Sequence, residues 1–173
     1  MPIYLLDTDV ISALMTSPGH RRRQKIEAWL RSLGDAPVML SSVSIAEINR
    51  GIALISNPAV AAAIRKSLDT ILSIYGDAII TPSHQEWQSF ARLSAIAELR
   101  HLCHGKNKKN LPRTGADLFL AIQAASINCA IATYNVDDFR LIGRHLPLSG
   151  GLVDVATAAW AKEPDAVAGV CNP

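Results

Sequence analysis

The feature that most constrains the fold is an apolar run near the N-terminus that ends in two carboxylates. Residues 3–6 read Ile-Tyr-Leu-Leu, and Asp7-Thr8-Asp9 follow at once. Apolar side chains on both faces of a short segment are typical of a central strand in a parallel sheet covered by helices on each side. Ligands bind such sheets at the carboxyl ends of the strands, where Asp7 lies. Because burying an unpaired carboxylate is costly, we expect Asp7 to have polar partners or a bound cation.

The rest of the chain alternates short apolar runs with helical patterns. Further strands are predicted at residues 38–40, 78–81, 130–133 and, as a last edge strand, 152–153. Helices are predicted between them, including one long helix from residue 84 towards residue 102. Ser83 and Glu86 have the spacing of a capping box at its start. This alternation predicts an α/β fold, with a mainly parallel sheet between two layers of helices. We expect one domain over residues 1–155 and a C-terminal tail over residues 156–173, packed at most in part on that domain.

The composition excludes several classes of protein. The chain has 173 residues, of which 49% are hydrophobic and 18% charged, so it is not intrinsically disordered. The net charge of +2 is too small to indicate nucleic-acid binding by itself. No apolar segment reaches the roughly 20 residues that span a bilayer, and no signal peptide is evident. The three cysteines lack metal-binding spacing, and their odd number favours a reducing compartment, so we expect a cytoplasmic protein.

Acidic residues recur at one kind of position. These acidic residues are Asp7, Glu47, Asp117 and the pair Asp137-Asp138. Each of them either follows an apolar strand or lies in the first turns of a helix that begins near the end of a strand. Carboxylates that converge on one edge of the sheet repel each other strongly, and a divalent cation removes that penalty. Mg²⁺ and Mn²⁺ prefer such oxygen ligands, and they support hydrolysis of phosphodiesters.

Each acid also has a purely structural interpretation, in a helix cap or a turn. In these alternatives Glu47 forms a capping box with Ser44, Asp117 caps with Thr114, Asp9 caps the first helix, and Asp137 and Asp138 belong to a turn. The common placement of all the acids weakens these alternatives.

Four segments in this order resemble a PIN domain, and in particular the VapC-type ribonuclease toxins of bacterial toxin–antitoxin pairs. They are LLDTDVIS at 5–12, SSVSIAEINRG at 41–51, ADLFLA at 116–121 and ATYNVDDF at 132–139. The resemblance implies a three-layer α/β/α sandwich and an endoribonuclease that depends on Mg²⁺ or Mn²⁺. It also implies an RNA substrate, a cognate antitoxin as partner, and a homodimer or a hetero-oligomer with the antitoxin.

The resemblance also assigns roles to individual residues. Asp7 and Asp117 match the principal Mg²⁺ ligands of the family. Glu47 matches its second acid, which binds the metal directly or through water and is a candidate general base. Asp138 matches the fourth acid, with Asp137 as a neighbour that points elsewhere.

Further residues are expected to support this site. Thr133 and Asn135 match the polar pair at the end of the strand, and Asp9 stands where the family commonly has Asn. An extra carboxylate at Asp9 would raise the pKa of a neighbouring acid or alter metal affinity. A basic segment before the third acid offers candidate RNA contacts, although it could equally be a solvated loop: Lys106, Lys108, Lys109 and Arg113.

Two other functions compete with the ribonuclease. In a phosphatase of the haloacid-dehalogenase type, Asp7 would attack phosphorus and Asp9 would act as acid and base. That scheme leaves Glu47 and Asp117 without a role. In a non-catalytic module, the fold would only bind RNA or a partner protein, but the presence of all four acids argues against it.

Overall fold

The computed structural model describes residues 1–104 and 114–166. In this part of the chain six strands form one sheet in the order β3-β2-β1-β4-β5-β6. Their bounds are β1 Tyr4–Leu6, β2 Val38–Ser41, β3 Ile79–Ile80, β4 Ala130–Thr133, β5 Leu152–Asp154 and β6 Ala159–Lys162. All neighbouring pairs are parallel except β5 and β6, which are antiparallel. The predicted mainly parallel sheet is confirmed.

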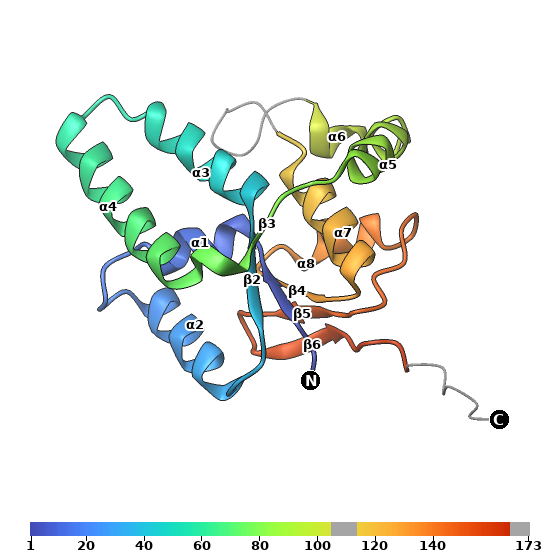
Figure 1. Cartoon of the computed structure of the whole chain (residues 1–173), viewed down its shortest axis with the longest axis horizontal. Coiled ribbons are helices and arrows are strands. Elements are labelled where there is room, and N and C mark those ends of the chain that lie inside the picture. The colour runs from blue at the N-terminus through green and yellow to red at the C-terminus, as the bar shows by residue number, and fades with distance from the viewer. Residues whose placement is uncertain (105–113, 167–173) are drawn as a thin grey trace.

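Helices cover both faces of this sheet, as the alternation of strands and helices predicts (Figure 1). Four of them pack on one face: α1 Thr8–Leu14, α2 Arg21–Ser32, α3 Ser42–Ala53 and α4 Pro58–Tyr75. Four further helices within residues 1–104 and 114–166 pack on the opposite face: α5 His84–Ser94, α6 Arg100–Cys103, α7 Ala116–Ile127 and α8 Val136–Ile142. A short 3₁₀ helix at Gly76–Ala78 links α4 to β3. The molecule is therefore an α/β/α sandwich.

The alternation of side chains along β1 divides the interior into two cores. Tyr4 and Leu6 face the helices α1–α4, whereas Leu5 faces α7 and α8. All three side chains are buried, as expected for a central strand. Asp7 follows directly, at the carboxyl end of the strand.

Two helices begin at caps that the sequence encodes. Ser83 and Glu86 form the predicted capping box at the start of α5. Ser41 caps α3 because its side chain accepts a hydrogen bond from the backbone N–H of Val43. Since Ser41 is also the last residue of β2, strand and helix join without a loop.

Two expectations about elements are wrong. The helix predicted from residue 84 towards residue 102 is broken between Ser94 and Arg100, where a turn carries the fully buried side chain of Leu99 into the core. The strand at Leu152–Asp154 is not the edge of the sheet, because β6 pairs with its outer side. β6 comes from the segment predicted as a tail, so part of that segment lies in the sheet. No helix in the described ranges is long and apolar enough to cross a membrane.

Candidate functional site

Asp7 joins the ends of the two central strands. It caps α1, and its Oδ1 accepts a hydrogen bond of 2.6 Å from the backbone N–H of Thr8. Its Oδ2 accepts a second bond of 2.6 Å from the hydroxyl of Thr133, the last residue of β4. The Asp7 side chain is only 3% exposed, so these bonds satisfy a carboxylate that water cannot reach freely.

Asp9 lies in the first turn of α1 and also reaches the end of β4. Its two carboxylate oxygens accept from the backbone N–H of Tyr134 at 3.4 and 3.2 Å. The cap of α1 is Asp7 and not Asp9, so the interpretation of Asp9 as a helix cap is wrong.

Glu47 lies on α3 and is connected to the start of α7. Its Oε1 accepts a hydrogen bond of 2.9 Å from the hydroxyl of Thr114, 67 positions later in the chain. The capping box with Ser44 is absent, because α3 is capped by Ser41 and the buried Ser44 hydroxyl has no partner among the described residues.

The remaining acids lie at the starts of α7 and α8. Asp117 is in the first turn of α7, whose N-cap is Gly115 without a capping side chain, so the cap by Thr114 is absent as well. Asp138 is in the first turn of α8 and accepts a 2.7 Å bond from Nδ2 of Asn135. The backbone N–H of Asn135 donates to the Thr133 hydroxyl at 2.8 Å.

Asp137, in contrast, points away from these groups. Its side chain is 94% exposed and lies 3.6 Å from the guanidinium of Arg140. Asp137 therefore has the orientation that the resemblance implies.

The pKa values show how closely the carboxylates lie. Burial raises the pKa of Asp7 well above its usual range, and the charges of Asp9 and Glu47 raise it further, against the hydrogen bonds from Thr133 and Thr8. Burial likewise raises the pKa of Asp9 to about 6, and the charge of Asp117 contributes. The structure thus brings Asp7, Asp9, Glu47 and Asp117 together, and connects Asp138 to them through Asn135 and Thr133.

The donor atoms of this cluster fit a hard divalent cation. They are all carboxylate oxygens, and a positive charge among them would offset both the burial and the repulsion that raise the pKa values of Asp7 and Asp9. Within residues 1–104 and 114–166, however, no three His, Cys, Asp or Glu side chains are already grouped as a metal site. Glu47 accepts a hydrogen bond at Oε1 from Thr114, and Asp138 accepts one at Oδ2 from Asn135.

The basic residues predicted to contact RNA cannot be placed relative to the acids. The candidate RNA contacts Lys106, Lys108, Lys109 and Arg113 lie outside the described residues. No local pattern in the sequence predicts the bond from Thr114 to Glu47 or the bond from Ser41 to Gln123. The buried Oε1 of Gln123 accepts from the hydroxyl of Ser41, the cap of α3, at 2.6 Å. A single amide within an otherwise apolar helix was the signal for that contact.

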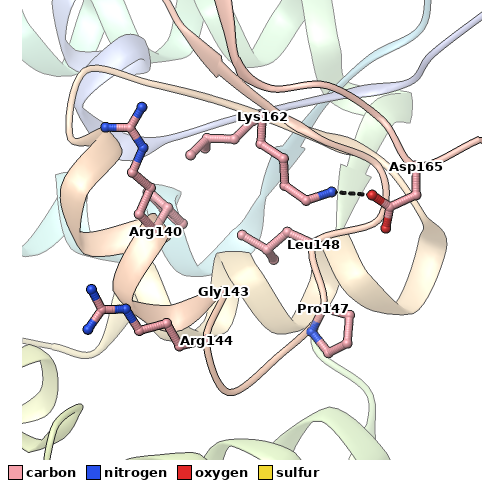
Figure 2. A pocket seen from close by; sticks show the side chains of 9 residues that line it. Arg140, Gly143, Arg144, Pro147, Leu148, Lys162 and Asp165 are labelled. Atoms are coloured by element: carbon pink, nitrogen blue, oxygen red, sulfur yellow. Dashed lines mark hydrogen bonds and ion pairs between the residues drawn. The ribbon is translucent and has the colours of Figure 1, made fainter.

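A cleft of about 390 Å³ lies elsewhere, between α8 and β6 (Figure 2). Its floor includes Leu148, and Arg140 and Arg144 extend from neighbouring turns at its border (Figure 2). Among the described residues that line it, the one carboxylate is Asp165, which is ion-paired with Lys162. None of the clustered acids lines this cleft, so it is separate from the candidate active site.

Comparison with known proteins agrees with this arrangement. Residues 4–144 match the family model described as PIN domain. The chain belongs to the PIN domain family. It is 29% identical to Toxin FitB of Neisseria gonorrhoeae over 137 residues, which cover 78% of this chain and 89% of FitB. The resemblance to PIN-domain toxins that the sequence predicts is confirmed.

Solved structures show the same fold. The crystal structure of FitAcB from Neisseria gonorrhoeae contains a chain that is 25% identical, with a TM-score of 0.58 over 80% of this chain and 92% of that one. The structure of VapBC-1 from nontypeable Haemophilus influenzae gives a TM-score of 0.59 at 23% identity, over 89% of this chain and 98% of that one. The second likeness concerns the fold alone.

Proposed function

We propose that this PIN-domain protein is an endoribonuclease that uses Mg²⁺ or Mn²⁺, and that it is the toxin of a toxin–antitoxin pair. The observation that carries the proposal is the placement of the acids at the carboxyl edge of the sheet. Asp7 is hydrogen-bonded to the last residue of β4, Asp9 to the residue after it, and Glu47 to Thr114 at the start of α7, whose first turn holds Asp117. PIN domains are generally nucleases and generally use divalent metal ions. The similarity to a protein named as a toxin, over 89% of its length, supports the second part of the proposal.

In this proposal Asp7 and Asp117 hold the metal ion, and Glu47 and Asp138 bind it directly or through water. When bound, the ion supplies positive charge for the developing charge of the phosphoryl transition state and lowers the pKa of water. Asp9 adds negative charge beside Asp7 and so strengthens the preference of the site for a cation.

The neighbouring polar residues orient these acids. Thr133 holds one oxygen of Asp7, and Asn135 holds one oxygen of Asp138. Thr114 holds Oε1 of Glu47, so Oε2 is the atom that would accept a proton from the attacking water. We assign these three residues to positioning and Glu47 to general base.

The family match favours the nuclease over the phosphatase alternative. A phosphatase of that type needs Asp7 as a nucleophile that can approach phosphorus. Here both oxygens of Asp7 are hydrogen-bonded and the side chain is nearly inaccessible. These features suit a carboxylate that holds a cation better than one that attacks a substrate.

The proposal extends to the partners and the location of the protein. The solved structure of FitAcB, whose matching chain is 25% identical to this one, is a toxin–antitoxin complex, which supports a cognate antitoxin for this chain. A homodimer, or a hetero-oligomer with that antitoxin, and a cytoplasmic location remain predictions.

The decisive experiment is cleavage of structured RNA by the purified full-length protein. Wild type, Asp7→Asn and Asp117→Asn are compared with Mg²⁺, Mn²⁺ or EDTA present. Asp137→Asn is a matched control, because it removes the same charge from a side chain that points to solvent. We expect cleavage by wild type and the control only with metal, and a loss of at least about 100-fold in the other two variants.

The other outcomes are equally informative. Cleavage that persists in both site variants would identify a contaminating nuclease and remove the site assignment. Hydrolysis of phosphate monoesters without RNA cleavage would favour the phosphatase. RNA binding without cleavage at any metal concentration would favour the non-catalytic module. The toxin role predicts that expressing wild type, but not Asp7→Asn, arrests bacterial growth.

A further inference from the structure

A second cleft, of about 410 Å³, borders the carboxylate cluster. Its volume is within the range of ordinary small-ligand sites. It is formed by the first turns of α3, the segment after β3, the exposed face of α5 and the residues around the start of α7. The lining includes Glu47, Arg50, Trp87, Thr114 and Phe119.

The cleft is lined by an aromatic ring, that of Trp87, which packs on other aromatic rings and is still exposed. Trp87 is 53% exposed, which is unusual for so large an apolar side chain. Its ring packs edge-to-face on Phe119, with ring centroids 4.4 Å apart, and Phe119 stacks on Phe90 at 4.1 Å. The two phenylalanine rings support the indole, which lines the cleft and is about half exposed.

Glu47 places this ring beside the candidate active site. The residue lines the cleft, and its charge also raises the pKa of Asp7. A phosphodiester held at the carboxylates would therefore have its neighbouring nucleotide at the mouth of the cleft. Arg50, one turn after Glu47 on α3, adds a positively charged group to the lining.

These features match the chemistry of a nucleotide with an unpaired base. An exposed aromatic ring binds single-stranded nucleic acid by stacking, which tolerates any base sequence. A guanidinium complements a phosphate. A double-stranded region could not insert a base into such a cleft without unpairing it.

We propose that this cleft binds one unpaired RNA base next to the bond that is cut, with Trp87 as the stacking surface. The proposal rests on the proposed nuclease function and specifies its substrate as RNA with an unstacked base, as in a loop or a single strand. Trp87 is here a binding residue that sets which phosphodiester reaches the carboxylates.

The test measures base stacking without cleavage. Full-length Asp7→Asn protein, and separately wild type in EDTA, are titrated into RNA hairpins that carry 2-aminopurine at one loop position each. Stacking quenches the fluorescence of this base analogue, so one position is expected to be quenched strongly. Adding Trp87→Ala should abolish that quenching and weaken RNA binding by roughly 5- to 100-fold.

Two further variants control for loss of folding and loss of charge. Trp87→Phe keeps an aromatic ring on Phe119 and should retain most of the quenching. Arg144→Ala removes a cation from the other cleft and should leave binding unchanged, whereas Arg50→Ala should weaken it. Thermal unfolding of each variant identifies any that fail to fold.

Failure of this inference differs from failure of the proposed function. If Trp87→Ala binds and is quenched as wild type is, the base site does not exist even where RNA is cleaved. If Trp87→Ala changes only the oligomeric state in sedimentation, the cleft is a protein contact and the inference is overturned. If wild type never cleaves RNA but the position-specific quenching persists, the nuclease proposal falls and the base site stands.

Discussion

Ionisation of Asp9 should lower the free energy of unfolding as pH rises. Its pKa is raised to about 6, so the folded state binds the proton more tightly than the unfolded chain, whose value is 3.8. The stabilisation from protonated Asp9 is therefore complete below about pH 4 and is lost as pH rises to about 6. The shift corresponds to roughly 3 kcal/mol at most, and coupling to Asp7 spreads it over both groups.

We predict that Asp9→Asn makes the protein more stable at pH 7 in EDTA, by about 1–3 kcal/mol. The amide oxygen of Asn can still accept from the backbone N–H of Tyr134, so the contact with β4 remains. Urea unfolding at pH 4, 5, 6 and 7 measures the effect. As pH rises from 4 to 7, the free energy of unfolding of the wild type should fall more than that of Asp9→Asn. The control Asp137→Asn should show the same pH dependence as the wild type. Parallel curves for wild type and Asp9→Asn would show that Asp9 is not perturbed.

The hydrogen bonds of the Thr133 hydroxyl can be tested separately from the packing of its side chain. Its hydroxyl donates to buried Asp7 and accepts from the backbone N–H of Asn135. Thr133→Val keeps the volume but leaves both groups without this partner, which should lower the free energy of unfolding by about 1–3 kcal/mol. Thr133→Ser retains the hydroxyl and should lose much less. Chemical denaturation measures both, and equal stability of the two variants would contradict the role of the hydrogen bonds.

At the scale of residues, the sequence predicts the acids better than their partners. Asp7, Glu47 and Asp117 could be located because each stands at a strand end or a helix start, and these positions follow from the alternation of elements. The bond from Thr114 to Glu47 joins positions that are 67 apart in the chain, and no local pattern specifies such a contact. Gln123 is detectable only as one amide in a mostly apolar helix, and its partner Ser41 is the last residue of β2, 82 positions earlier in the chain.

Among the elements, β5 depends on the close approach of two backbones. A Cβ at Gly150 would lie 2.2 Å from the carbonyl oxygen of Cys129, just before β4. Because backbone atoms cannot yield as a flexible side chain does, Gly150→Ala should destabilise the protein by about 1–3 kcal/mol or more. Gly19→Ala is the matched control, since nothing lies within 4 Å of the added atom. Thermal unfolding measures both changes, and similar melting temperatures would contradict the predicted clash.

Local sequence patterns do not predict two features of the fold, the break between α5 and α6 and the strand β6. The break between α5 and α6 contains neither Gly nor Pro, and the turn is favoured because it buries Leu99 completely. β6 is a short segment without strong alternation, and it becomes a strand by pairing with β5. Tertiary contacts thus determine both the break between α5 and α6 and the formation of β6. The capping box of Ser83 and Glu86, in contrast, depends on residues three positions apart and is predicted from the sequence.

In the whole molecule, the sheet order is what brings the acids together. β1 lies between β2 and β4, so the chain after each of these strands leads into the same edge (Figure 1). Asp7 follows β1, Glu47 lies on the helix after β2, and Thr133 ends β4. The alternation of elements predicts the parallel sheet and hence this edge. The strand order that makes these three strands neighbours is a property of the complete fold.

If these acids hold a divalent cation, the ion must stabilise the folded molecule, because the unfolded chain does not assemble the cluster. A ligand at 100 times its dissociation constant adds about 2.7 kcal/mol to the free energy of unfolding. For a domain of this size that raises the melting temperature by roughly 5–10 °C. We expect Mg²⁺ or Mn²⁺ to raise the melting temperature of wild type at pH 7.5, and EDTA to reverse the rise.

Variants separate binding at the cluster from a general effect of salt. Asp7→Asn and Asp117→Asn should lose the metal-dependent rise, whereas Asp137→Asn should retain it, because that carboxylate points to solvent. Na⁺ at equal ionic strength should leave the melting temperature of wild type nearly unchanged. An equal rise in all three variants would place the cation elsewhere on the molecule. Since this measurement needs no RNA, it tests the metal site even where the substrate remains unidentified.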